Sequence, residues 1–266
     1  MNVFRQEFRM SRLTMLVWII ALVLVTTMFV SLFPAFSNDI EASRKLLENF
    51  PPQLRAAFGL SLSSFFTFLG FYAYTFTYIG LAGAIQAMNL GLISLSREAS
   101  AHTTDFLLTK PISRSRIFVA KLSSALLVLI ITNLVLTSVT LLLTQLFSTG
   151  SFNMNTFLLL NLAFGIVQII FLAIGMLVSQ LVRKVKSSIA LTLGIVFGFF
   201  AIGLLQATTN DDTLRYLTPF KYFDHMKVVS DGAYQPQFVW LSAALVIVAI
   251  AVSFFLYTRR DARSIS

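Results

Sequence analysis

The strongest constraint on the fold is a series of six long apolar segments separated by polar connections. A transmembrane helix needs about 20 predominantly apolar residues, and each segment reaches or approaches that length. Charged residues are only 12% of the chain, against about 25% in a soluble domain, so the chain cannot cover a water-facing surface. The sequence therefore predicts an all-α polytopic membrane protein of one domain. Its expected transmembrane helices are 14–36, 62–89, 122–146, 157–181, 188–206 and 238–257.

The distribution of positive charge predicts the orientation of the chain in the cell membrane. Of the 20 Lys and Arg residues, 14 lie in connections that share one side of the membrane. Cytoplasmic connections carry the excess of Lys and Arg, so both termini are expected in the cytoplasm. The net charge of +9 is thus explained by topology, and no nucleic-acid partner is expected. The 14 residues lie in segments 1–13, 97–121, 183–186 and 259–263.

Two regions outside the spans have amphipathic patterns. In residues 1–13, Val3, Phe4 and Phe8 alternate with three arginines, which favours either an interfacial helix or a basic flank that fixes the topology. Residues 37–61 predict two short helices divided at Pro51 and Pro52, with Leu46, Leu47 and Phe50 sharing one face of the first. Residues 207–236 are expected to form an interfacial cap, with contact to a substrate or partner as the alternative.

The expected spans contain no Asp, Glu, Lys, Arg or His. Proton-driven transporters usually place ionisable groups inside the membrane, so this pattern disfavours proton coupling and, less strongly, sodium coupling. The polar side chains within the spans are expected to form interhelical hydrogen bonds, with the lining of a substrate path as the alternative. They are Gln86, Asn89, Asn133, Gln145, Asn161 and Gln168.

The chain shows no pattern typical of an enzyme. It has no cysteine and only two histidines, His102 and His225, which fall on opposite sides of the membrane in the expected topology. The dipeptide glycine–lysine does not occur, so the chain cannot contain a P-loop. We therefore expect no catalytic residue, no metal and no cofactor on this chain. If ATP drives the protein, another polypeptide binds it.

The fifth expected span carries small residues at intervals of four. Ala190, Gly194 and Gly198 share one helix face, and small residues at this spacing permit close approach of two backbones. This face predicts either packing within the subunit or a dimer seam.

The connection between the second and third spans is a capped, proline-broken elbow, 97–116. Ser100 is expected to cap a short helix that ends at Lys110 and Pro111, because the residue before proline avoids the helical region. Ser113 is expected to cap the next helix, which leads into the third span. Basic residues alone would be enough to fix the orientation in the membrane. The two capped helices and the turn at proline therefore suggest that the elbow is a docking surface.

The elbow contains an acid, then Thr, an acid, a Leu pair, Pro, a small apolar residue, Ser and Arg, and a Lys that leads into the third span. With the six spans and cytoplasmic termini, this pattern resembles the membrane-spanning permease of ABC transporters of the ABC-2 type, an exporter family. The residues that carry the resemblance are Glu98, Thr104, Asp105, Leu107, Leu108, Pro111, Ile112, Ser113, Arg114 and Lys121.

The resemblance implies an ATP-driven exporter of a hydrophobic or amphipathic substrate. The elbow would be the coupling helix that docks in a groove of a separate ABC ATPase, which binds ATP and Mg, and two permeases, identical or different, would pair. The alternatives are a non-transporting scaffold or regulatory subunit, or a secondary transporter. The residues expected to contact the ATPase are Glu98, Thr104, Asp105, Phe106, Leu107, Leu108 and Pro111.

Basic residues beside the spans have a second expected role. Each Lys or Arg near an anionic membrane surface contributes about 1 kcal/mol to the attraction between the protein and that surface. We therefore expect the following residues to fix topology or to hold lipid head groups: Arg114, Arg116, Lys121, Arg183, Lys184 and Lys186.

Overall fold

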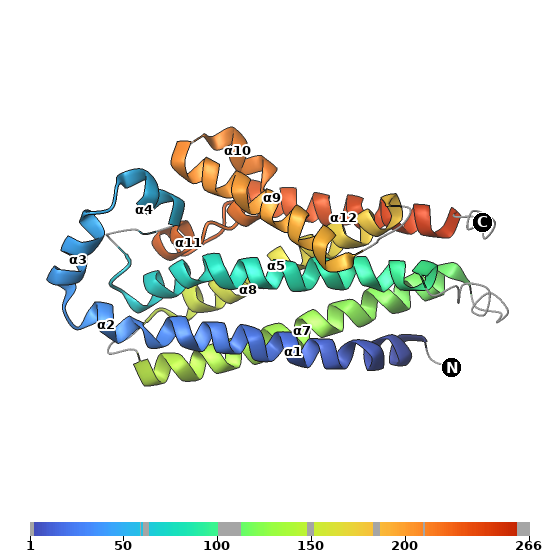
Figure 1. Ribbon diagram of the computed structural model, residues 1–266, viewed down its shortest axis with the longest axis horizontal. Helices are drawn as coiled ribbons and strands as arrows, with labels where there is room; N and C mark the ends of the chain where they lie inside the picture. The colour runs from blue at the N-terminus through green and yellow to red at the C-terminus, as the bar shows by residue number, and fades with distance from the viewer. Residues whose placement is uncertain are drawn as a thin grey trace.

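The computed structural model shows a bundle of six long helices (Figure 1). The structure describes residues 3–58, 60, 64–100, 113–147, 152–182, 187–209 and 211–259, without the side chains of 57–58 and 97–100. All six helices are long and apolar enough to cross a membrane, which confirms the predicted fold class. They are α1 (Val3–Ser31), α5 (Phe68–Ser100), α7 (Arg114–Phe147), α8 (Met154–Leu181), α9 (Ser188–Thr209) and α12 (Pro236–Arg259).

The helices form three layers. α5 and α8 pack together along the centre, α1 and α7 lie side by side on one flank, and α9 and α12 lie on the other (Figure 1). The start of α1 and the end of α12 lie at the same end of the bundle, together with the junction of α5 and α7. This arrangement agrees with termini on one side of the membrane, and the assignment of that side to the cytoplasm stays a prediction.

The N-terminal segment is not a separate helix. α1 runs unbroken from Val3 to Ser31 and is followed by the short α2 (Phe33–Ser37). No Pro or Gly interrupts Val3–Ser31, so nothing in the sequence ends a helix near residue 13. The predicted division between 1–13 and 14–36 is therefore absent, and the position of the first turns at the interface stays a prediction.

The helices also extend beyond the apolar segments that predicted them. α5 continues past Asn89 to Ser100, and α7 begins at Arg114 rather than at Leu122. Hydropathy marks where the membrane ends, whereas Arg, Glu and Lys are good helix formers and carry a helix onward into water. The connection between the second and third spans is consequently shorter than its polar sequence suggests.

The two short helices predicted in residues 37–61 are present. They are α3 (Ile40–Glu48), whose first turn is capped by Asp39, and α4 (Pro52–Phe58). Only Leu47 of the three residues predicted to share a face is buried; Leu46 and Phe50 are 64% and 49% exposed. α3 ends at Glu48, so Phe50 lies beyond the helix and does not share a helical face with Leu46 and Leu47.

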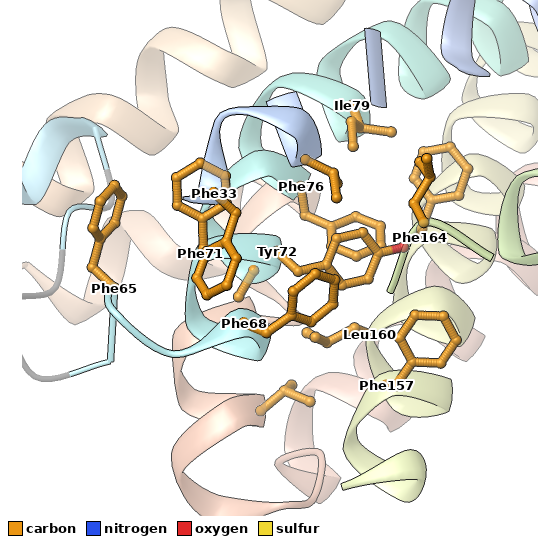
Figure 2. Packing of buried hydrophobic residues seen from close by; sticks show 14 of the residues in the cluster. Phe33, Phe65, Phe68, Phe71, Tyr72, Phe76, Ile79, Phe157, Leu160 and Phe164 are labelled. Carbon is orange, nitrogen blue, oxygen red and sulfur yellow. The ribbon is translucent and has the colours of Figure 1, made fainter. Parts of the chain in front are cut away.

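Aromatic rings fill the end of the bundle that lies away from the termini (Figure 2). Phe33 of α2 packs on Phe71 of α5 with ring centroids 5.6 Å apart, and Tyr72 of α5 stacks on Phe157 of α8 at the same distance. The Tyr72 hydroxyl donates a hydrogen bond of 3.0 Å to Oδ1 of Asn161. This cluster holds α2, α5 and α8 together at that end of the bundle.

Further along the bundle, α5 and α8 cross with their backbones in contact. A Cβ atom on Gly91 would lie 2.3 Å from the carbonyl oxygen of Leu172, and one on Gly175 would lie 2.3 Å from that of Met88. Real Cβ atoms do not approach other atoms this closely, so both positions require glycine. This contact fixes how far α5 and α8 are shifted along their axes relative to each other.

Candidate functional site

Most of the predicted coupling elbow lies outside the described residues. Glu98 belongs to the last turn of α5, where only the backbone is described. At the other end, the carbonyl of Ser113 accepts a hydrogen bond of 3.2 Å from the amide of Ile117, so Ser113 directly precedes the first turn of α7. Capping by its side chain stays a prediction. The other predicted ATPase contacts lie in 101–112, outside the described part of the chain: Thr104, Asp105, Phe106, Leu107, Leu108 and Pro111.

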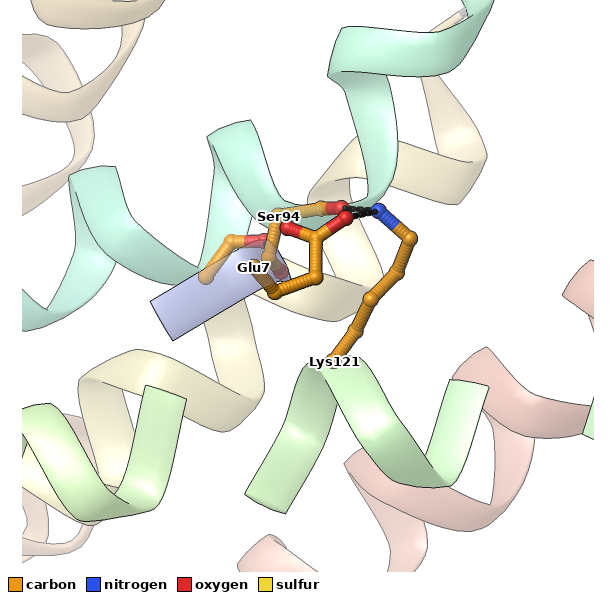
Figure 3. Close-up of polar contacts among 4 residues, drawn as sticks. Glu7, Ser94 and Lys121 are labelled. Carbon is orange, nitrogen blue, oxygen red and sulfur yellow. Dashed lines mark hydrogen bonds and ion pairs between the residues drawn. The ribbon is translucent and has the colours of Figure 1, made fainter. Parts of the chain in front are cut away.

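At the base of the elbow, Lys121 of α7 joins three helices (Figure 3). Its Nζ lies 2.8 Å from Oε1 of Glu7 in α1 and donates a hydrogen bond of 2.8 Å to the carbonyl oxygen of Ser94 in α5. The two side chains are 1% and 15% exposed. An ammonium taken out of water is tolerated only when it is paired and hydrogen-bonded, and these contacts meet that need. We call Glu7, Ser94 and Lys121 the basal clamp.

The basal clamp corrects the role expected for Lys121. A side chain buried among three helices does not reach lipid head groups, so Lys121 holds the bundle together instead. Glu7 was not identified from the sequence, although one signal was present: it is the only acid among three arginines in residues 1–13.

The other basic residues of this end divide into two groups. Arg116 is exposed at the start of α7, and Arg114 is half-buried. For these two, binding of lipid head groups stays a prediction. Arg183, Lys184 and Lys186 lie outside the described residues.

Polar side chains link the central helices within the membrane. Gln168 of α8 donates to Oε1 of Gln86 in α5 at 3.1 Å and accepts from Nδ2 of Asn133 in α7 at 2.6 Å. Gln86 in turn donates to the hydroxyl of Thr132 at 3.2 Å. The predicted interhelical hydrogen bonds are therefore confirmed for Gln86, Asn133, Asn161 and Gln168. Gln145 is exposed, and the buried Oδ1 of Asn89 has no partner among the described residues.

The small-residue face of α9 points away from the rest of the subunit. Ala190, Gly194 and Gly198 are exposed, and a Cβ atom on either glycine would meet nothing within 4 Å. Of the two alternatives, packing within the subunit is thus wrong for this face. It remains open to lipid or to another chain.

Between α9 and α12 the chain folds back onto the bundle as α10 (Asp212–Leu217), the 3-10 helix η1 (Pro219–Lys221) and α11 (His225–Asp231). Arg215 fixes this segment, because its Nε donates a hydrogen bond of 2.9 Å to the carbonyl of Lys221 and its guanidinium lies 4.0 Å from the ring centroid of Phe238. The region that was expected to form a cap therefore has a defined hydrogen-bonded shape.

A cavity lies between this segment and helices α5, α8 and α9. Its wall includes His225, whose ring stacks on Phe76 of α5 at 5.0 Å. Burial lowers the pKa of His225 to about 4, so its imidazole is neutral at pH 7. Within the described part of the chain, no three His, Asp or Glu residues group as metal ligands. The cavity is thus an aromatic chamber whose wall also contains Lys221 and Asp224.

A second cavity adjoins the basal clamp at the other end of the bundle. It lies between α1, α5 and α7 and is lined by Glu7, Trp18, Asn89 and Lys121, among others. The two cavities consequently meet α5 at different levels, at residues 73–80 and 86–94.

Comparison with known proteins agrees with this architecture. Among curated proteins, none matches the chain. A family model described as ABC-2 family transporter protein matches residues 1–262, nearly the whole chain. The chain belongs to the ABC-2 transporter family and is a multi-pass membrane component of an ABC transporter.

Proposed function

We propose that this chain is the permease subunit of an ATP-driven exporter and that it moves a hydrophobic or amphipathic substrate outward. A separate ABC ATPase binds ATP and Mg and docks on the elbow around Glu98, Phe106, Leu107 and Pro111. The termini and the elbow lie in the cytoplasm, where that ATPase is found.

The basal clamp is the observation that carries the coupling part of this proposal. α5 and α7 are the two helices that flank the elbow, and the clamp ties both of them to α1. A movement of the elbow is therefore passed to three helices instead of one. Close packing favours this transfer, because well-packed helices move as bodies.

The docking claim predicts a specific loss in elbow variants. Phe106→Asp and Leu107→Asp place a charge on the apolar surface, so each is expected to reduce recovery of the ATPase and its substrate-stimulated rate by about tenfold. Recovery is measured by co-purification in mild detergent. Ser115→Asp is the matched control, because Ser115 is exposed in the first turn of α7, where an acid is tolerated. Unchanged recovery and rate in both elbow variants would show that the ATPase docks elsewhere.

Two alternatives, a scaffold and a secondary transporter, differ from an exporter in their energy source. Vesicles that contain the chain, its ATPase and labelled substrate are expected to show ATP-dependent movement of the label. A scaffold gives no movement under any condition. A secondary transporter gives movement that follows an ion gradient and persists without the ATPase.

We also propose that the face of α9 formed by Ala190, Gly194 and Gly198 is the seam with a second permease. The chain has no cysteine, so Gly194→Cys or Gly198→Cys introduces a single thiol. Oxidation in native membranes is expected to join two copies of either variant through their introduced thiols, seen as a band of twice the mass that reductant removes. Trp240→Cys is the control, because Trp240 is 74% exposed on α12, away from the seam. Equal cross-linking of all three variants would contradict the seam.

A further inference from the structure

The cavity between α5, α8, α9 and residues 219–226 has the lining of a ligand site. Its volume is about 70 Å³, several times the roughly 10–15 Å³ that one water molecule requires, so a small head group fits inside. Aromatic rings form much of the wall, with Phe76 from α5, Phe164 from α8, Phe200 from α9 and Phe220 from η1. An apolar group is therefore favoured inside.

One cation in this wall has no acceptor within the described residues. Lys221 lines the cavity, and its ammonium makes no hydrogen bond or ion pair in the described part of the chain. Desolvation lowers the pKa of Lys221, and the charge of Asp224 offsets only part of that effect. A half-buried cation in this position is stabilised further by an anion.

The other charged or titratable groups nearby have partners among the described residues. Asp224 also lines the cavity and its charge acts on Lys221, while its Oδ1 accepts the backbone amides of Met226 and Lys227 at 3.1 and 3.4 Å. His225 is neutral and stacks on a ring, and Arg215 lies over Phe238. Lys221 is thus the group in this wall that an incoming anion would meet.

We propose that this cavity binds the anionic head of a single-chain amphipathic cargo, with Lys221 as the counter-ion and the aromatic rings around the adjoining part of the chain. That the bound molecule is transported rests on the proposed export function, whereas the binding site itself does not depend on it. The volume suits one small head group and leaves no space for the two acyl chains of a phospholipid.

Binding to the purified full-length chain in non-ionic detergent tests the site directly. Dodecyl phosphate, dodecanol and dodecyltrimethylammonium share one chain length and differ in head-group charge. Titration calorimetry is expected to show that dodecyl phosphate binds about tenfold more tightly than dodecanol, because a charged hydrogen-bond partner is gained, and that the cation binds most weakly. Equal binding of the three probes would overturn the proposal.

Two sets of variants test the charge of Lys221 and the volume of the cavity separately. Lys221→Met is expected to abolish the preference for dodecyl phosphate and Lys221→Arg to retain it, while Lys227→Met, an exposed lysine of α11, leaves it unchanged. Gly80→Leu fills the cavity from α5, where a Cβ meets nothing within 4 Å, and should weaken all three probes. Gly194→Leu, on the outer face of α9, is its control. A full preference for dodecyl phosphate in Lys221→Met would reject the assigned counter-ion.

The origin of the ligand is tested by competition. Phosphatidylglycerol added in mixed micelles should displace dodecyl phosphate poorly, and displacement at equal concentration would make the cavity a lipid site, contrary to the cargo assignment. These measurements use the chain without an ATPase. Failure of binding therefore leaves the docking experiment on Phe106 and Leu107 unaffected, and failure of docking leaves the binding result unaffected.

Discussion

Glu7→Ala is expected to lower the free energy of unfolding by about 3 kcal/mol, because it leaves the Lys121 ammonium buried with its counter-charge removed. The hydrogen bond to the carbonyl of Ser94 remains, so the loss falls at the lower end of the range for breaking a buried pair. The measurement is thermal or denaturant unfolding of the purified chain in detergent. The same variant should also weaken the coupling of substrate to ATP hydrolysis in the complex, since the ion pair that joins α1 to α7 is lost.

The double variant Glu7→Ala with Lys121→Met is the decisive comparison. Removing both charges abolishes the buried ion, so the double variant should recover most of the stability lost by Glu7→Ala alone. Glu48→Ala serves as the control, because Glu48 is an exposed acid at the end of α3. A Glu7→Ala protein as stable as the Glu48→Ala protein would mean that the basal clamp does not hold the helices together.

Gly91→Ala and Gly175→Ala are each expected to destabilise the chain by about 3 kcal/mol, the upper end of typical overpacking costs. The atoms that a methyl group would meet belong to the backbone of the facing helix, at 2.3 Å in both cases, and no side chain can rotate away. α5 and α8 would have to separate along their whole crossing. Unfolding in detergent measures the loss, and reduced yield of the monodisperse protein accompanies it.

Gly194→Ala is the matched control for the crossing. It adds the same methyl group to a membrane helix at a position with nothing within 4 Å, and a helix interior favours Ala over Gly by about 0.5–1 kcal/mol. The isolated subunit should therefore be as stable as before or slightly more so. Similar unfolding of Gly91→Ala and Gly194→Ala would show that the backbones of α5 and α8 do not touch.

The spans were predictable and the helix ends were not. An apolar run of span length has one stable solution in a bilayer, so six runs predict six helices. The helix ends depend on helix propensity and capping in water, which is why α5 continues to Ser100 and α1 includes residues 3–13. Hydropathy contains no information about either extension.

The residues that hold the bundle together were harder to predict. Ala190, Gly194 and Gly198 have the regular spacing typical of a helix contact, yet this face is open, whereas the backbones meet at Gly91 and Gly175, which lie on two different helices. Lys121 looked like a membrane-surface residue because its partner, Glu7, is 114 positions away. Pairings of this kind follow from the fold and leave no local pattern in the sequence.

α9 has two sides with different surroundings. Gly194 and Gly198 face outward, while Phe200, Gly203 and Leu204 of the same helix line the cavity that contains Lys221. A helix is stiff, so a rotation imposed on the outer side turns the inner side by the same angle. A neighbouring chain that rotates α9 therefore changes the width of the chamber without touching it.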